Sequence, residues 1–226
     1  MRYKKLFFDK KSEYHPDIVT AKSVMPEWYK NAKTFLDKKP RFIPTNNVTI
    51  KGCMPFLDTY ICGYMYLLKG DVIVEKDDIG NSILTWGSEE LVTVRSKESH
   101  QKLPFPVAHE EQYFSWAVSN SIELPNNYSF LVTHPLNRFD LPFTTLSAII
   151  DKSLSVGALS FFIHKDFTGL IPAGTPIAQI IPFKQTSWKA LRKEGLSDKL
   201  EDESKGFRML LAGGYKKKKW VRKRYE

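Results

Sequence analysis

Residues 121–181 decide the fold and read SIELPNNYSFLVTHPLNRFDLPFTTLSAIIDKSLSVGALSFFIHKDFTGLIPAGTPIAQII. Short runs rich in Val, Ile, Phe and Thr, such as 128–133 and 158–164, are separated by turn residues such as Pro125-Asn126-Asn127 and Pro172-Ala173-Gly174. Such runs are typical of β-strands, and the turn residues supply the backbone conformations that tight reversals need. Because no helix intervenes between the strands, the pattern predicts an all-β barrel or sandwich and excludes an alternating α/β fold.

The same pattern extends toward the N-terminus. It predicts strands at 48–51, 60–68, 71–75, 82–85, 91–95, 113–118, 128–133, 145–151, 158–164 and 176–182. Pro26 at a first helical position, followed by Glu27, predicts a short helix over 26–33. A second helix is predicted over 186–194, with a Thr186 or Ser187 cap and an end at Gly195.

These elements divide the chain into three parts. Residues 1–45 are expected to form a basic N-terminal arm with a short helix, and residues 46–183 a β core with an insertion around 76–112. Residues 184–226 are expected to form a helix followed by a basic aromatic tail. A length of 226 residues, 42% of them hydrophobic, suits one such domain with appendages.

The charge of the chain is concentrated at its ends. The formal net charge is +9, but residues 1–41 and 215–226 each carry +6, which leaves residues 42–214 at −3. A mildly acidic body with two basic ends indicates arms that contact an acidic partner, a phosphate backbone or a neighbouring subunit. Solvated ends that only aid solubility are the alternative.

Several features indicate a protein of the cytoplasm. The longest apolar run, 159–163, is far shorter than the ~20 residues of a membrane helix, and the N-terminus lacks the apolar region of a signal peptide. Cys53 and Cys62 form neither a disulfide framework nor a CxxC site, so we expect two buried thiols in a reducing compartment.

Three groups of residues in the opening stretch occur in a characteristic order and spacing. They are Ile122-Glu123-Leu124-Pro125 followed by Tyr128, Ala148-Ile149-Ile150-Asp151, and the run 172–179, PAGTPIAQ. In this order they resemble the second, third and fourth motifs of the trimeric dUTPase and dCTP-deaminase superfamily. The resemblance implies a β-clip, a distorted barrel of short strands, and by analogy a trimer in which C-terminal arms cross to a neighbouring subunit.

The chain departs from that superfamily at the positions of its catalytic and phosphate-binding residues. His134 and Pro135 stand where its second motif has phosphate-binding Arg-Ser, and Met65 stands where the first motif has an aspartate. The tyrosine that discriminates deoxyribose has no counterpart after Asp151, and the glycine-rich phosphate lid is not evident. The glutamate of the deaminases is missing from 158–163. Because a fold can persist when function is lost, ordinary dUTPase or deaminase activity is not expected.

The resemblance nevertheless implies that one set of polar residues lies together at an end of the clip: His134, Asn137, Arg138, Asp140, Asp151 and Gln179. In one interpretation they form a nucleotide pocket, where Asp151 is the base that activates water and Arg138 and Gln179 contact phosphate. In the other they form a structural network that holds a proline-flanked loop. No HxH or HExxH spacing supports a metal site from His134, Asp140, Asp151 or His164, so no metal or cofactor is predicted, except Mg²⁺ if the chain is a hydrolase.

The C-terminal tail interleaves aromatic and basic residues. Its candidate contacts are Lys216, Lys217, Lys218, Lys219, Trp220, Arg222, Lys223 and Arg224. Such residues neutralise phosphates and stack on bases, which predicts salt-sensitive, non-specific nucleic-acid binding. An arm between subunits is the equal competitor.

These observations lead to one hypothesis with two alternatives. The leading hypothesis is a non-catalytic or strongly diverged dUTPase-like β-clip protein that acts as a binding or assembly module, as a homo-oligomer or with an assembly partner. Segments 25–30, 133–138 and 166–172 look like a family of uncharacterised phage and bacterial proteins, so a phage-encoded protein of the host cytoplasm or the virion is compatible. The alternatives are a nucleotide hydrolase that uses Asp151 and a nucleic-acid-associated protein that uses its tail.

Overall fold

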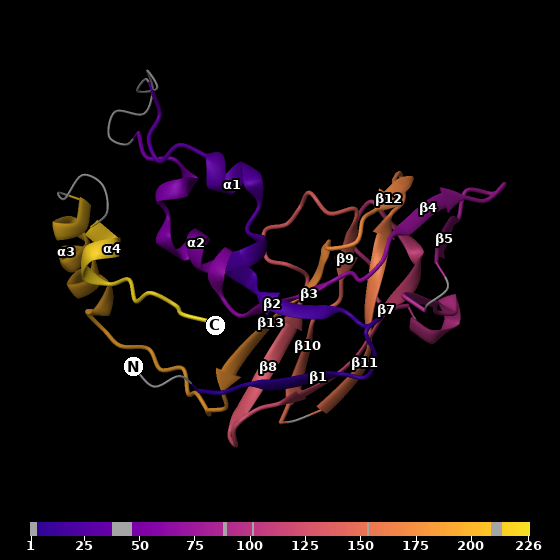
Figure 1. The fold of residues 1–226 in the computed structure, drawn as a ribbon. Helices are drawn as coiled ribbons and strands as arrows, with labels where there is room; N and C mark the ends of the chain where they lie inside the picture. Colours follow the sequence, from indigo (N-terminus) through magenta and orange to yellow (C-terminus); the bar gives the residue numbers. More distant parts are fainter. Residues whose placement is uncertain (1–3, 38–46, 88–89, 101, 153, 209–213) are drawn as a thin grey trace. The chain divides into compact units, whose positions relative to one another are not determined.

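The computed structural model describes residues 4–37, 47–87, 90–100, 102–152, 154–208 and 214–226. The chain divides into two compact units (Figure 1). Unit 1 comprises residues 1–24 and 63–185, and unit 2 comprises residues 25–62 and 186–226. Of the chain, 39% is strand and 18% is helix, and the strands form open antiparallel sheets, so the predicted all-β character is confirmed. A closed barrel is not formed among the described strands.

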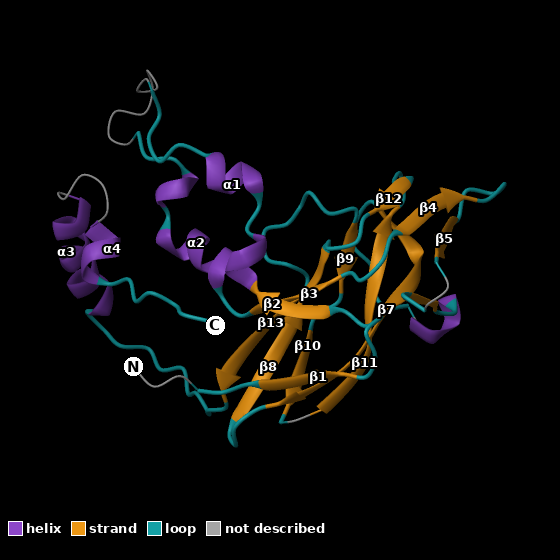
Figure 2. Cartoon of the chain, in the orientation of Figure 1, coloured by secondary structure: helices purple, strands orange, loops and turns teal. Residues whose placement is uncertain are grey.

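Unit 1 holds three antiparallel sheets (Figure 2). The first has the order β1-β7-β11-β9, with β6 also paired to β7. Its strands are β1 (Phe7–Lys10), β6 (Val92–Val94), β7 (His109–Glu123), β9 (Phe143–Thr145) and β11 (Leu154–His164). The second has the order β10-β8-β13-β3-β2. Its strands are β2 (Asp17–Thr20), β3 (Tyr64–Leu67), β8 (Tyr128–Thr133), β10 (Ala148–Asp151) and β13 (Pro176–Lys184).

The third sheet has the order β12-β4-β5, with β4 (Val72–Lys76), β5 (Ser82–Trp86) and β12 (Gly169–Ile171). Two short 3₁₀ turns, η1 (Ala21–Val24) and η3 (Lys97–His100), complete the unit. Strands of all three sheets contribute to one hydrophobic core. At its centre the rings of Trp116 and Phe161 stack with centroids 3.7 Å apart, and both side chains are fully buried. Such aromatic burial is a large part of the apolar stabilisation of a sheet core.

One close backbone approach fixes the start of β3 against β13. Gly63 has φ +75°, and a Cβ placed there would lie 2.0 Å from the carbonyl oxygen of Ile180. Glycine is therefore the residue that this turn allows, because any other would be strained in φ and would collide with backbone.

Unit 2 is helical, with α1 (Glu27–Asn31), η2 (Ile50–Gly52), α2 (Met54–Ile61), α3 (Leu196–Arg208) and α4 (Gly214–Lys218). The rings of Trp28 and Tyr29 of α1 pack against Phe56 and Tyr60 of α2, with centroids 4.9–6.5 Å apart. The predicted helix over 26–33 is confirmed in its position, with Pro26 directly before α1. Among the described residues no helix is both long and apolar enough to span a membrane.

Some predicted elements differ from the structure. The predicted helix over 186–194 is wrong, because residues 186–193 have no regular secondary structure and are exposed, and α3 begins one residue after Gly195. The apolar residues Trp188 and Leu191 have nothing to pack against within that segment, and short helices are marginal without packing. The predicted strand over 60–68 begins only at Tyr64, since Met54–Ile61 forms α2 with a proline in its first turn.

The predicted three-part division also differs. Residues 1–45 do not form a separate arm, because β1 pairs with β7 and β2 pairs with β3 inside the sheets of unit 1. The predicted boundary at 45–46 lies outside the described residues. Within the predicted insertion around 76–112, β5 pairs with β4 and β6 pairs with β7. Short N-terminal runs found partners far away in sequence, which local pattern does not reveal.

Candidate functional site

Asp151, the predicted catalytic base, lies at the end of β10 opposite Ser129 of β8. The buried Ser129 hydroxyl donates to Asp151 Oδ1 at 2.6 Å. The Gln185 side-chain amide donates to Ser129 Oγ at 2.8 Å and to Asp151 Oδ1 at 3.3 Å. This triad joins β8, β10 and the chain directly after β13, so the carboxylate has a structural role in the second sheet.

His134 follows the last residue of β8 and is held at both ring nitrogens. The Thr145 N–H donates to Nδ1 at 3.4 Å, so the ring proton lies on Nε2, which donates to the Arg138 carbonyl at 3.1 Å. Burial is the main cause that lowers the pKa of His134 below its ordinary value of 6.5, and the Arg138 charge adds to this. A neutral imidazole therefore bridges the 134–138 turn to β9.

Arg138 and Asp140 pair with each other on the same loop. The guanidinium binds both carboxylate oxygens, with Nε to Oδ1 and NH2 to Oδ2 each at 2.8 Å. Hydrogen bonding to Arg138 holds the pKa of Asp140 below its usual value. Asn137, which directly precedes Arg138, has φ +58°, a left-handed conformation that asparagine tolerates better than most residues. In this bidentate pair the Arg138 guanidinium is bound by Asp140, whereas the sequence predicted that Arg138 would contact a phosphate.

Gln179 lies in the middle of β13 and is fully buried. Its Oε1 accepts the backbone N–H of Leu136 at 2.9 Å, which ties the 134–138 turn to the centre of the second sheet. The glutamine thus supports a neighbouring loop.

The structure brings five of the six predicted residues together and places Asp151 elsewhere. His134, Asn137, Arg138 and Asp140 share one loop, and Gln179 holds that loop through Leu136. This loop follows the end of β8, whereas Asp151 pairs with Ser129 near the beginning of β8. Five residues of strand separate the two places, on the order of 15 Å at 3.3 Å per residue. Asp151 and the loop that holds Arg138 therefore lie toward opposite ends of β8.

The C-terminal tail is anchored within unit 2. The Trp220 indole N–H donates to Asp58 of α2 at 3.0 Å, Lys223 pairs with the same carboxylate at 2.9 Å, and the Tyr225 hydroxyl lies 3.3 Å from Cys62 Sγ. Lys219 pairs with Glu203 of α3 at 2.8 Å. The tail residues that remain outermost are Lys216, Lys217, Arg222 and Arg224, all exposed.

A histidine pair was not anticipated. His109 and His164 are register partners at the ends of β7 and β11, with ring centroids 4.0 Å apart. His109 is 7% exposed and Thr144 Oγ1 lies 2.9 Å from its Nε2. Burial, followed by the charge of His109, lowers the pKa of His164. Within the described residues no group of three or more His, Cys, Asp or Glu is arranged to hold a metal ion.

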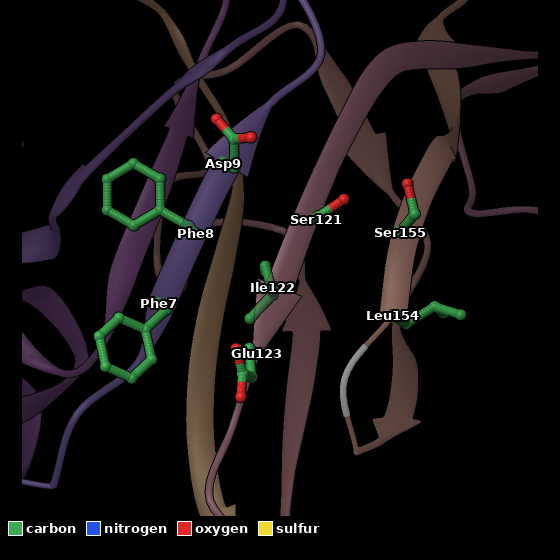
Figure 3. Close-up of a pocket in the computed structure, with 8 residues that line it drawn as sticks. All are labelled: Phe7, Phe8, Asp9, Ser121, Ile122, Glu123, Leu154 and Ser155. Atoms are coloured by element: carbon green, nitrogen blue, oxygen red, sulfur yellow. The ribbon is translucent and has the colours of Figure 1, made fainter.

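A surface groove in unit 1 also escaped sequence analysis (Figure 3). It has a volume of about 520 Å³ and lies across β1, β7 and β11. We call it the β1 groove, and its lining residues are Phe7, Phe8, Asp9, Ser121, Ile122, Glu123, Leu154 and Ser155. Among these lining residues Phe7, Phe8 and Leu154 carry large apolar side chains that are 58%, 52% and 49% exposed. The groove could not be predicted from the sequence, because the segment that forms β1 was expected to belong to a separate arm.

A scan against protein-family models and a search of curated proteins each found no match to this chain.

Proposed function

We propose that this chain is a non-catalytic, strongly diverged β-clip-like protein that acts as a binding or assembly module, in the host cytoplasm or in a phage particle. One observation carries the proposal. The polar residues that a dUTPase-like enzyme would offer to a nucleotide are engaged in internal hydrogen bonds, and Asp151 lies far from the loop that holds Arg138.

The surface of unit 1 supports the same proposal. Buried polar groups that are satisfied internally stabilise a scaffold, whereas exposed apolar groups gain from a partner. The β1 groove presents three exposed apolar side chains beside two carboxylates, Asp9 and Glu123. A scaffold with such a surface is suited to binding another protein surface.

The test measures nucleotide turnover. The full-length protein is incubated with a panel of nucleoside triphosphates and Mg²⁺, and released phosphate and pyrophosphate are measured beside Asp151→Asn and the matched surface variant Asp198→Asn. We expect no release above the no-protein background for any of the three proteins. Release that Asp151→Asn abolishes and Asp198→Asn preserves would overturn the proposal in favour of a nucleotide hydrolase.

A second function is favoured by the exposed cations of the tail. Lys216, Lys217, Arg222 and Arg224 are exposed in a segment that Asp58 anchors through Trp220 and Lys223. Neutralising phosphates with such cations releases counterions, and binding then weakens steeply with salt. Arg222→Gln combined with Arg224→Gln should lower salt-sensitive retention on single-stranded DNA. Unchanged retention, or none in the unmodified protein, would exclude this role.

A further inference from the structure

Three of the five histidines of the chain lie around β9, which ends the strand order of the first sheet. His109 reaches the strand through Thr144, whose Oγ1 lies 2.9 Å from His109 Nε2. His134 reaches it through Thr145, whose N–H donates to His134 Nδ1 at 3.4 Å. His164 is stacked on His109, with ring centroids 4.0 Å apart. Because histidine ordinarily changes its charge between pH 5 and 8, the contacts of this one strand depend on the protonation of three rings.

β9 joins the first sheet to the second. It has three residues and pairs with β11, while the Thr145 hydroxyl donates to the Ile177 carbonyl of β13 at 2.6 Å. The ring of Phe143 packs edge-on against the ring of His134, with centroids 5.8 Å apart. A strand this short forms few ladder hydrogen bonds, and segments with few contacts open at the lowest free energy. The links to β13 and to His134 therefore matter for keeping β9 in place.

Protonation reverses the role of His134 Nδ1. The neutral ring donates from Nε2 to the Arg138 carbonyl at 3.1 Å and accepts at Nδ1 from the Thr145 N–H. In the imidazolium both ring nitrogens are donors. The Nδ1–H would then face the Thr145 N–H, and a donor that is shielded from water without an acceptor is costly. The cation is therefore favoured only when β9 moves away from His134.

Protonation also acts on the ends of β7 and β11. His109 and His164 are register partners at these ends, and His109 is 7% exposed. Two imidazolium rings with centroids 4.0 Å apart would repel each other, and charges away from water are screened weakly. The His164 N–H donates at 3.0 Å to the carbonyl of Pro142, the residue directly before β9. A displacement of this end therefore reaches the same strand.

The charges that face His134 leave it neutral near pH 7. Arg138 and Asp140 both face the ring, and they are paired with each other. Burial lowers the pKa of His134 first, and the charges of Arg138 and His109 lower it further, against the opposing effect of Asp140.

The charges that face the other two rings act in the same direction. Asp166 raises the pKa of His164, but burial and the charge of His109 outweigh it and the pKa is lowered. Glu110, the next residue after His109, is bound by Lys76 and the Ser82 hydroxyl. The carboxylate nearest to His109 in sequence is thus already engaged.

We propose that β9 and the 134–142 loop form an acid-operated latch, in which protonation of His134 and of the His109–His164 pair detaches β9 from the second sheet. Detachment would uncover Leu141 and Phe143, which are 7% and 1% exposed in the closed form and belong to the core of unit 1. The latch regulates what surface the protein presents, and it does not depend on the proposed assembly function.

The sign of the effect follows from proton linkage. In the closed form the pKa values of His134 and His164 lie below 6.5, whereas in the opened form the solvated rings titrate near 6.5. Opening is therefore favoured as the pH falls through 6.5. Each histidine raises the opening equilibrium by up to about 10-fold between about pH 7.5 and 5.5, and the two together by up to about 100-fold.

The first experiment measures amide hydrogen exchange of the full-length protein at pH 7.5, 6.5 and 5.5, by mass spectrometry of peptides and with correction for intrinsic exchange rates. Peptides over 134–147 should lose protection by about 10- to 100-fold on acidification, whereas peptides over 113–118 of β7 should lose much less. An equal loss in both regions would show unfolding of the whole unit and would overturn the latch. Unchanged protection of 134–147 would overturn it as well. This comparison lies within the unmodified protein, so it holds whether or not a variant folds.

The second experiment removes the titrating groups. His134→Asn keeps an acceptor close to the place of Nδ1, and His164→Phe keeps a ring stacked on His109 without a charge. In the double variant the protection of 134–147 should change by less than about threefold between pH 7.5 and 5.5. His15→Asn is the matched control, because His15 Nδ1 also accepts a backbone N–H, that of Ser12 at 3.1 Å, in the β1–β2 connection. The control should keep the full pH dependence, and a double variant that keeps it too would contradict the latch.

Discussion

Replacing Gln179 by methionine separates a structural role from a ligand-binding role. The two side chains have similar volume, so Gln179→Met leaves no large cavity in β13. The change removes the Oε1 that accepts the Leu136 N–H at 2.9 Å from a fully buried position. If Gln179 served only to bind a nucleotide, its replacement would not lower the stability of the protein. If Gln179 holds the 134–138 turn, its replacement lowers the stability.

The expected loss follows from the unpaired donor. The Leu136 N–H that loses its acceptor is part-buried, and an unsatisfied donor that is shielded from water costs about 1–3 kcal/mol. We expect the free energy of unfolding to fall by about 2 kcal/mol. In a chain of this length each kcal/mol lowers Tm by about 2–4 °C, so the midpoint should fall by about 4–8 °C.

The assay is thermal and urea unfolding followed by circular dichroism, since the sheets dominate the signal. Gln185→Met is the matched control, because it also removes a glutamine hydrogen bond, to Ser129, but from an exposed position. The control should lose at most about 0.5 kcal/mol. If Gln179→Met unfolds at the same temperature as the unmodified protein, the turn is not held by Gln179 and the structural interpretation of the loop is wrong.

Three further changes test the fold and its electrostatics. Gly63→Ala should lower the free energy of unfolding by more than about 3 kcal/mol, measured in urea, because its Cβ would collide with the Ile180 carbonyl at a positive φ. Asp58→Ala removes the acceptor of Trp220 and should speed tryptic cleavage of the tail severalfold. Because the folded pKa of His134 lies below its unfolded value near 6.5, the unfolded chain binds more protons below that pH, and stability falls on acidification. His134→Gln should therefore flatten the dependence of unfolding on pH between about 7.5 and 5.5.

Each of these changes has a control or a contradicting outcome. Gly87→Ala, whose Cβ would meet open space, should change stability by less than about 0.5 kcal/mol. Asp198→Ala in α3 should leave tail cleavage at its original rate. Equal slopes of stability against pH for His134→Gln and the unmodified protein would show that another group carries the acid sensitivity, with His164 the next candidate because its pKa is also lowered.

Sequence analysis predicted the strands well where the pattern is local. The strands over 128–133, 158–164 and 176–182 match β8, β11 and β13 closely, because β-branched and aromatic alternation reports a half-buried extended chain. It failed over 60–68, where an apolar run suited both a strand and a buried helix, and over 186–194, where a helical pattern found nothing to pack against. The resemblance to dUTPases and dCTP deaminases stays a prediction.

The candidate site shows the same limit more sharply. Its residues on one loop were grouped correctly, since neighbours in sequence remain neighbours in space. Asp151 was grouped with them wrongly, because its distance from Arg138 depends on the register of β10 on β8. The β1 groove was missed because it needs β1, β7 and β11 side by side, and these strands are far apart in the chain.

The amino-acid sequence by itself determined that the chain is strand-rich, that its body is nearly neutral and that its ends are basic, because composition and short-range alternation decide these properties. Tertiary structure alone decided which polar groups are satisfied and which surfaces remain exposed. Strand register and the burial of Gln179, Ser129 and the Trp116–Phe161 pair arise from contacts between residues distant in sequence. Those contacts engage Gln179, Arg138 and Asp151 in internal hydrogen bonds, and they leave the apolar side chains of Phe7, Phe8 and Leu154 exposed.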